Sequence, residues 1–321
     1  MSFSLEVKEE LSRQIPKSRH CRLAELAGIL LMCGQLMKNK NGKTYLSISF
    51  ENEAVYRKCF TLLKKTFKIG IKLGEEEDIS LEKRNTYRID LEDDTEVSLL
   101  LEATKLKAVY YESMMVLSLA TGLGLQHTCC KRAFLRGVFL SNGSISDPLK
   151  SYHFEVVCSM EEKAGIIRRV ICDLDLDAKI VQRKKYRVVY LKESAQIVEV
   201  LAVMEANVAL LNLENIRILK NMRNSLNRQV NCETANISKT VSAAVRQIED
   251  IRFIKDSVGF SDMPDGLREV AELRLEYDDM PLKELGQMLD PPLGKSGVNH
   301  RLRKLSAIAT ELRDKRGGDL L

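Results

Sequence analysis

An internal repeat constrains this chain more than any other feature of its sequence. The nonapeptide 26–34 (LAGILLMCG) resembles 135–143 (LRGVFLSNG), so the two copies are offset by 109 residues. The same offset places the helix-like stretch 53–67 on 162–176, and it aligns Ile69 and Ile71 with Ala178 and Ile180. Because several elements agree on one offset, we interpret the first two thirds of the chain as a duplication.

Each copy has the hydrophobic spacing of a mixed helix and strand unit. Apolar residues alternate with a period of two in 45–50 and 153–157, as expected for strands, and they follow helical spacing in 53–67. The pattern predicts an α+β domain with pseudo-twofold symmetry, in which each copy folds as αββαββα. Segments 87–91 and 186–190 match at the shorter offset of 99, so the first copy has about ten extra residues in a hairpin around 75–82.

The repeated nonapeptide carries glycines at matching positions. Small residues at Gly28 and Gly34, and at Gly137 and Gly143, would allow two helices to approach closely. In this respect the chain resembles the LAGLIDADG homing endonucleases. The resemblance implies that two motif helices pack at the pseudo-dyad and that each ends in a carboxylate, which holds metal ions at the scissile phosphates.

The residues at the expected acid positions are Cys33 and Asn142, neither of which is a carboxylate. Hard divalent cations prefer carboxylate oxygens, so these side chains would not hold Mg²⁺ as the endonucleases do. Asp147 lies four residues beyond Gly143 and has Lys38 at the matching place in the first copy. We therefore predict a homing-endonuclease scaffold with no catalytic residues, no metal and no cofactor. An active nuclease remains the least favoured alternative.

DNA affinity could survive in such a scaffold, because the endonuclease sheets lie in the DNA groove. The second copy has basic residues on adjacent strand-like segments that could contact phosphates: Lys179, Arg183, Lys184, Lys185 and Arg187. The first copy instead has an acidic run, 75–78 (EEED), which would repel phosphate or attract a protein partner. The alternative interpretation, that both runs are solvated hairpin tips, is equally open.

The last third of the chain shows only helical periodicity. We expect a linker helix over 213–226, a polar, Asn-rich segment over 227–241 joining it to the next helix, and a further helix from Pro264. The expected domains are thus a first repeat with an N-terminal helix (1–125), a second repeat (126–212), the linker helix, and an all-α DNA-binding domain (227–321).

A helix-turn-helix is predicted near the C-terminus. Pro281 opens a short helix, 290–295 (DPPLGK) forms a turn, and Ser296 is a plausible N-cap for a second amphipathic helix extending to Ala309. Segment 291–310 contains no acidic residue, and its polar face carries the residues that we expect to contact double-stranded DNA: Lys295, Ser296, Asn299, His300, Arg301, Arg303 and Lys304. A plain helical hairpin with a solvated basic face is the alternative.

The 8 cysteines show no CxxC spacing, which favours buried thiols over a metal or disulfide framework. The longest apolar stretch, 113–125, is too short to cross a membrane, and Glu6, Glu9 and Glu10 replace the cationic start of a signal peptide. We expect a cytoplasmic, nucleoid-associated protein.

Nearly the entire chain is similar to the bacterial WhiA family. The segments that carry the resemblance are SFSLEVKEELSR, ELAGILLMCGQL, FLRGVFLSNGSISDP, NRQVNCETANISKTVSAA and LKELGQMLDPPLGKSGVNHRLRKL. The resemblance implies a DNA-binding transcriptional regulator, tied to sporulation septation in actinobacteria and to cell division and chromosome handling in Firmicutes. It also implies a WhiB-type protein partner where the organism has one. A division scaffold that barely touches DNA is the alternative function.

Overall fold

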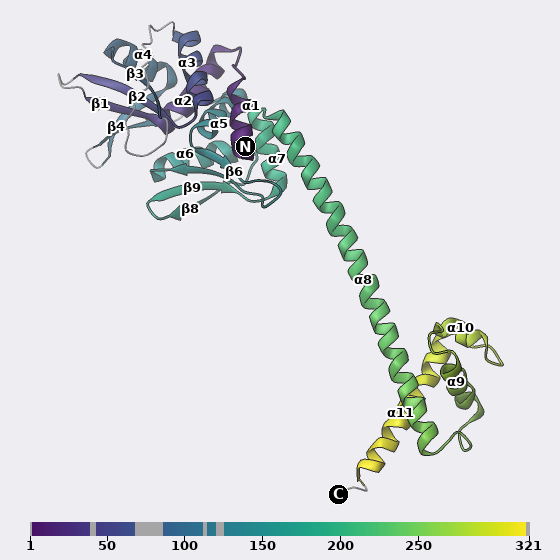
Figure 1. Cartoon of the computed structure of the whole chain (residues 1–321). Helices are drawn as coiled ribbons and strands as arrows, with labels where there is room; N and C mark the ends of the chain where they lie inside the picture. The colour runs from purple at the N-terminus through teal and green to yellow at the C-terminus, as the bar shows by residue number, and fades with distance from the viewer. Residues whose placement is uncertain (1, 39–42, 68–85, 112–113, 120–124, 319–321) are drawn as a thin grey trace. The chain divides into compact units, whose positions relative to one another are not determined.

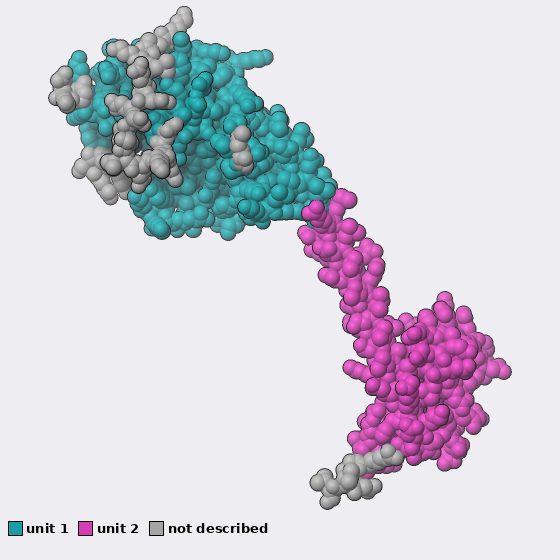
Figure 2. Space-filling model, viewed as in Figure 1, with its two compact units in different colours: residues 1–221 teal, residues 222–321 magenta. Residues whose placement is uncertain are grey.

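A computed structural model of the chain describes residues 2–38, 43–67, 86–111, 114–119 and 125–318 (Figure 1). By internal contacts the chain divides into two compact units, residues 1–221 and 222–321 (Figure 2). In the described residues, no helix combines the length and the apolar character needed to cross a membrane.

The first unit contains the two predicted copies, and the predicted fold class is confirmed. The second copy has the order αββαββα: α5 (Thr128–Asn142), β6 (Gly143–Ile145), β7 (Phe154–Cys158), α6 (Glu161–Cys172), β8 (Lys179–Arg183), β9 (Tyr186–Leu191) and α7 (Ser194–Met204). The first copy follows α1 (Phe3–Ser12) and comprises α2 (Arg19–Cys33), β1 (Gly34–Lys38), β2 (Thr44–Phe50), α3 (Glu53–Phe67), β3 (Tyr87–Leu91) and α4 (Asp94–Thr104). Helices α2 and α5 begin and end 109 residues apart, the offset found in the sequence. The expected strand at 69–71 and the acidic hairpin, including Glu75, Glu76, Glu77 and Asp78, lie outside the described residues.

Each copy has an antiparallel sheet, with strand order β1-β2-β3 in the first and β6-β7-β9-β8 in the second. Buried cross-strand pairs set the registers, Ile48 opposite Ile89 and Val156 opposite Val189. A further hairpin, β4 (Leu106–Tyr111) and β5 (Met114–Leu119), follows the first copy, with β5 beside β1. The repeat pattern of the sequence gives no indication of this hairpin.

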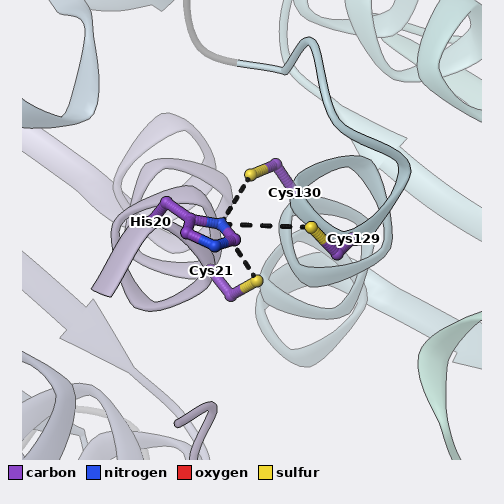
Figure 3. Close-up of side chains that lie close together, drawn as sticks. All are labelled: His20, Cys21, Cys129 and Cys130. Atoms are coloured by element: carbon purple, nitrogen blue, oxygen red, sulfur yellow. Dashed lines mark hydrogen bonds between the residues drawn. The ribbon is translucent and has the colours of Figure 1, made fainter. Parts of the chain in front are cut away.

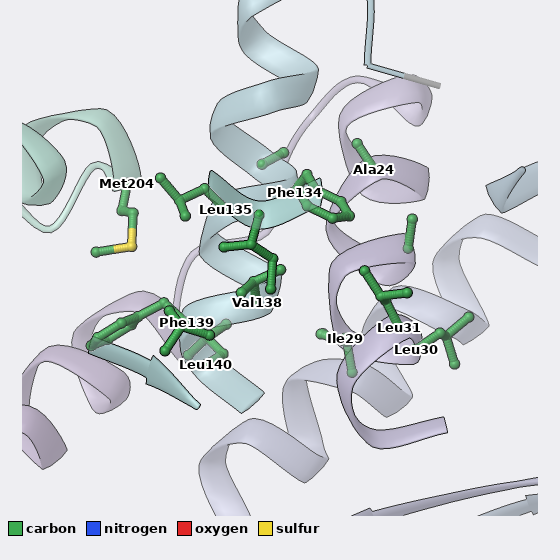
Figure 4. Close-up of a cluster of buried hydrophobic side chains, with 14 of the residues drawn as sticks. Ala24, Ile29, Leu30, Leu31, Phe134, Leu135, Val138, Phe139, Leu140 and Met204 are labelled. Carbon is green, nitrogen blue, oxygen red and sulfur yellow. The ribbon is translucent and has the colours of Figure 1, made fainter. Parts of the chain in front are cut away.

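The core of the first unit is built around the packing of α2 against α5 (Figure 4). A Cβ atom added at Gly137 would lie 2.2 Å from the carbonyl O of Glu25, and one added at Gly28 would lie 2.3 Å from that of Phe134. The predicted role of these two glycines is confirmed, because only a hydrogen atom fits between the two backbones.

Gly34 and Gly143 have a different role from the one predicted. Each follows the last residue of its helix, where a Cβ would meet the preceding turn of that same helix: the nearest atom is Leu30 O at 2.6 Å for Gly34 and Phe139 Cδ2 at 2.3 Å for Gly143. These glycines therefore permit the tight change from helix to strand and do not form the helix crossing.

Buried charges connect the same two helices to their surroundings. The fully buried Glu25 of α2 pairs with Lys58 of α3, and the Nε of Arg136 on α5 lies 3.2 Å from Glu25 Oε1. Lys58 Nζ also donates to Leu11 O at 2.7 Å, and Arg136 Nη1 donates to Glu205 Oε2 at 2.7 Å. This network of four charged side chains ties the two copies together near the middle of the motif helices.

The linker is a longer helix than predicted. Helix α8 (Asn207–Ser257) continues through 227–241, the Asn-rich segment that we expected to separate two helices, so the expected boundaries at 213 and 227 both fall inside it. The segment contains neither Gly nor Pro, hence nothing forces the helix to end. Local bonds such as Gln229 Nε2 to Glu233 Oε1, at 3.0 Å, satisfy some of its polar side chains.

The second unit contains the C-terminal part of α8 and three more helices: α9 (Asp265–Glu276), α10 (Leu282–Gln287) and α11 (Lys295–Gly318). Its separate core is formed by Ile251, Ile254, Val270, Ala271, Leu285, Leu289, Val298, Leu302, Leu305 and Ala309. Every helix of this unit contributes to that core, which fixes the position of α11.

Candidate nucleic-acid interface

Helices α10 and α11 form the predicted helix-turn-helix. The connecting turn folds back on α10, where Leu293 N donates to Gly286 O at 2.8 Å, and a Cβ at Gly286 would lie 2.1 Å from Leu293 O. Helix α11 begins at Lys295, and Gly294 O accepts the bonds from Gly297 N and Val298 N. Ser296 is therefore inside the first turn, and its predicted role as the N-cap is wrong.

The two faces of α11 differ sharply in burial and charge. Val298, Leu302 and Leu305 are at most 1% exposed and pack in the core of the second unit. The opposite face exposes five of the seven predicted DNA-binding residues: Lys295, Ser296, His300, Arg303 and Lys304. This exposed face, which we call the α11 cationic face, has no acidic residue before Glu311.

The other two predicted residues do not point freely outward. Asn299 is half-buried, and Arg301 is half-buried with its Nη1 donating to Gly266 O of α9 at 2.9 Å. The Arg301 guanidinium also packs on Gly266, where an added Cβ would lie 3.0 Å from Cζ. Arg301 therefore joins α11 to α9 and does not project outward with the exposed cations, as the spacing along α11 had suggested.

Replacing Arg301 with alanine should lower the free energy of unfolding of the second unit by about 1–2 kcal/mol, because a charge-assisted bond and its packing are lost. Arg301→Lys should not restore it, since an ammonium lacks the planar fork that reaches Gly266 O. The measurement is urea unfolding followed by helical circular dichroism. Arg303→Ala, at an exposed site of the same helix, is the control and should change stability by less than about 0.5 kcal/mol.

The basic residues of the second copy lie on the β8–β9 hairpin. Three of them are in ion pairs: Lys179 with Asp177 at 3.7 Å, Arg183 with Glu155 at 2.9 Å and Arg187 with Glu161 at 3.2 Å. Lys184 and Lys185 form the exposed turn, and Lys185 Nζ lies 5.4 Å from the ring centre of the exposed Tyr186. Among the five, Lys184 and Lys185 are thus the best placed to meet a phosphate backbone.

The two positions at which the resemblance led us to look for acids, Cys33 and Asn142, meet at the C-terminal ends of the motif helices. Cys33 Sγ lies 3.9 Å from Asn142 Oδ1, and Asn142 Nδ2 donates to Val157 O at 3.3 Å. Burial raises the pKa of Cys33 and lowers the pKa of the adjacent Lys163, whose Nζ donates to Leu31 O at 2.6 Å. A thiol and an amide beside a lysine do not form a site for a hard divalent cation.

Asp147 does not replace the missing carboxylates at the helix ends. It follows β6, where its Oδ1 accepts from Leu149 N at 2.9 Å and stabilises a turn. Asp147 therefore lies past the end of β6, away from the ends of the motif helices, and its carboxylate serves the local turn.

The cysteine spacing favoured buried thiols, but several cysteines lie outside the core. Cys129, Cys172 and Cys232 are exposed, and Cys21 is half-buried. Cys21, Cys129 and Cys130 also gather around His20, a cluster that the sequence analysis missed (Figure 3). The available signal was the repeat itself, because its 109-residue offset places the pair 20–21 (HC) on the pair 129–130 (CC).

Three family models match most of the chain. Residues 19–107 match a WhiA N-terminal LAGLIDADG-like domain, residues 131–223 a WhiA LAGLIDADG-like domain, and residues 226–309 a WhiA C-terminal HTH domain. The models place the two repeats and the helix-turn-helix in the same order as the structure.

Similar proteins cover the chain from end to end. A protein of Lachnoclostridium phytofermentans named "Probable cell division protein WhiA" is 50% identical, over 98% of this chain and 100% of the relative. A protein of the same name from Alkaliphilus oremlandii is 49% identical, over 98% of each chain. The crystal structure of full-length DUF199/WhiA from Thermatoga maritima aligns with a TM-score of 0.58 and 26% identity, over 97% of this chain and 99% of that one.

Proposed function

This chain belongs to the WhiA family, and from that premise we propose that it is a sequence-specific DNA-binding transcriptional regulator of cell division and chromosome handling. In a sporulating organism the proposed role extends to sporulation. The observation that carries the proposal is the α11 cationic face, an exposed, acid-free surface on the second helix of a helix-turn-helix. Such a helix enters the DNA major groove in proteins of this class.

In the proposed complex, the residues of α11 have different roles. His300, Arg303 and Lys304 face the DNA, where a cation can either pair with guanine or neutralise a phosphate. Lys295 and Ser296, in the first turn of α11, are placed to contact the backbone. Arg301 instead positions the helix through its bond to Gly266 O.

We assign the repeat domain a non-catalytic role. Cys33 and Asn142 stand where carboxylates would be needed, so we propose a platform that adds backbone contacts through Lys184 and Lys185, a surface for a protein partner, or both. A WhiB-type partner applies only where the organism has one. Both DNA-binding surfaces together would keep the protein at the nucleoid.

Chromatin immunoprecipitation with sequencing tests the proposal, with the tagged protein compared with its Arg303→Ala/Lys304→Ala variant. We expect discrete promoter peaks that the variant loses. On a recovered site in vitro, the variant should bind roughly 30- to 25,000-fold more weakly, if each of the two side chains contributes about 1–3 kcal/mol, as a base contact does. Fluorescence anisotropy at two salt concentrations provides that measurement.

A matched control removes the same charge elsewhere in the second unit. Arg252 and Lys255 are exposed on α8, and Arg252→Ala/Lys255→Ala should retain the peaks and most of the affinity. Promoter peaks that persist in Arg303→Ala/Lys304→Ala would contradict the proposal that α11 recognises the DNA sequence. Diffuse binding that is lost only in Lys184→Ala/Lys185→Ala would assign the affinity to the repeat domain and favour a nucleoid or division scaffold.

A further inference from the structure

Four metal-ligating side chains converge where the motif helices begin. His20 and Cys21 lie in the first turn of α2, and Cys129 and Cys130 lie in the first turn of α5 (Figure 3). His20 Nδ1 is 3.2 Å from Cys130 Sγ, 3.4 Å from Cys21 Sγ and 4.0 Å from Cys129 Sγ. All four ligand atoms lie within 4.8 Å of one another.

The pseudo-symmetry of the fold explains why these residues meet. Position 20 corresponds to 129 and position 21 to 130 under the 109-residue offset, so each helix contributes the same two positions. Because the glycine crossing holds α2 and α5 closely together, the two dipeptides face each other across the pseudo-dyad. The cluster thus lies on the two helices whose packing forms the centre of the core of the first unit.

The spacing of the four ligand atoms is compatible with a tetrahedral zinc ion. Zn–S bonds of about 2.3 Å and Zn–N bonds of about 2.0–2.1 Å place a ligand nitrogen about 3.6 Å from each sulfur in a regular tetrahedron. The three observed nitrogen–sulfur distances fall on both sides of that value. Three cysteines and one histidine are a common ligand set for structural zinc, and thiolates disfavour the hard cations Mg²⁺ and Ca²⁺.

We propose that His20 Nδ1 and the sulfurs of Cys21, Cys129 and Cys130 bind one Zn²⁺ ion. Each thiol loses its proton to solvent on binding, the imidazole stays neutral, and no electron is transferred. Both ligand pairs sit at helix N-termini, where the helix dipoles stabilise thiolate charge.

The proposed ion is structural. Four protein ligands leave no open coordination position for a substrate. Cys33 follows His20 by thirteen positions along α2, which puts the ion about 20 Å from the end of α2 that carries Cys33. It would cross-link the two copies at one end of the motif helices, while Gly28 and Gly137 hold them together further along.

Zinc content of the full-length protein tests the proposal. Chain purified under reducing conditions without chelator and analysed by elemental mass spectrometry should hold one Zn²⁺ per molecule. Cys21→Ser and Cys130→Ser should lose that zinc. Cys172→Ser, which removes an exposed thiol of α6 outside the cluster, is the matched control and should keep it.

A ligand-exchange variant and a second metal test the same four ligands by binding that is retained as well as by zinc that is lost. His20→Cys converts the site to four thiolates and should retain zinc, whereas His20→Ala should bind it much more weakly. Co²⁺ added to the metal-free protein should give the thiolate charge-transfer band and visible d–d bands of tetrahedral cobalt. Both signals should be absent in Cys130→Ser and present in Cys172→Ser.

Folding of the variants does not limit the test. Stripping zinc from the wild-type chain with a chelator should lower its Tm, and Zn²⁺ but not Mg²⁺ should restore it. The proposal is overturned if the reduced wild-type chain takes up no stoichiometric zinc. It is equally overturned if folded Cys130→Ser keeps the metal, if a disulfide joins these cysteines in the reduced cell extract, or if the bound metal is an iron–sulfur cluster.

Discussion

Replacing Gly137 with alanine should destabilise the first unit by about 3–5 kcal/mol, toward the upper end of what a single substitution does. The added Cβ would lie 2.2 Å from Glu25 O and 3.1 Å from Ile29 N, both backbone atoms of the facing helix. No rotamer change relieves such a contact, so α2 and α5 must move apart and the core between them must open. Urea unfolding followed by tyrosine fluorescence measures the effect, because 8 of the 9 tyrosines precede residue 222.

Gly165 provides a matched control on a neighbouring helix. It lies inside α6 with open space around its Cα, so Gly165→Ala should be neutral or stabilise the unit by up to about 1 kcal/mol through its higher helix propensity. Gly28→Ala should resemble Gly137→Ala, and the double variant should cost less than the sum, since one separation of the helices relieves both contacts. A Gly137→Ala chain as stable as the wild type would contradict the close crossing.

The helix crossing also shows what could be predicted from the sequence. The repeated nonapeptide located the C-terminal parts of both motif helices and included the two glycines, Gly28 and Gly137, at which they cross. The prediction succeeded because a duplicated fold imposes the same spacing on both copies. A pattern that arises by chance in one copy is not expected to recur in the other. The β4–β5 hairpin has no counterpart in the second copy, and this explains why the repeat gave no indication of it.

Other features were missed for physical reasons that concern particular residues. The Asn-rich segment 227–241 suggested a break between two helices. A solvent-exposed helix tolerates polar side chains, however, and this segment has no Gly or Pro to interrupt it. Arg301 was placed on the outer face from its spacing, although its long side chain reaches Gly266 O of a different helix. Spacing along one helix cannot reveal such a tertiary partner, and CxxC rules cannot reveal ligands from two helices 109 residues apart.

Removing the charge of Glu25 should produce the second large effect. Glu25→Gln is expected to lower the free energy of unfolding of the first unit by about 3–5 kcal/mol, because it leaves the fully buried Lys58 without its counter-charge. Glu53→Gln, which breaks the exposed pair with Arg57 on α3, is the control and should cost no more than about 0.5 kcal/mol. The same tyrosine-detected urea unfolding provides the measurement.

The pH dependence and a double variant distinguish charge from packing. Burial lowers the pKa of Lys58 while Glu25 opposes the shift, so the pKa should fall further in Glu25→Gln. The unfolded chain then binds more protons than the folded one, and the stability of the variant should rise as the pH approaches the ordinary pKa of lysine. Glu25→Met/Lys58→Met replaces the pair with apolar side chains and should recover most of the loss, because no unpaired charge remains buried on α3. If the double variant is as unstable as Glu25→Gln, the bond from Arg136 to Glu25, and not Lys58, is the main source of the loss.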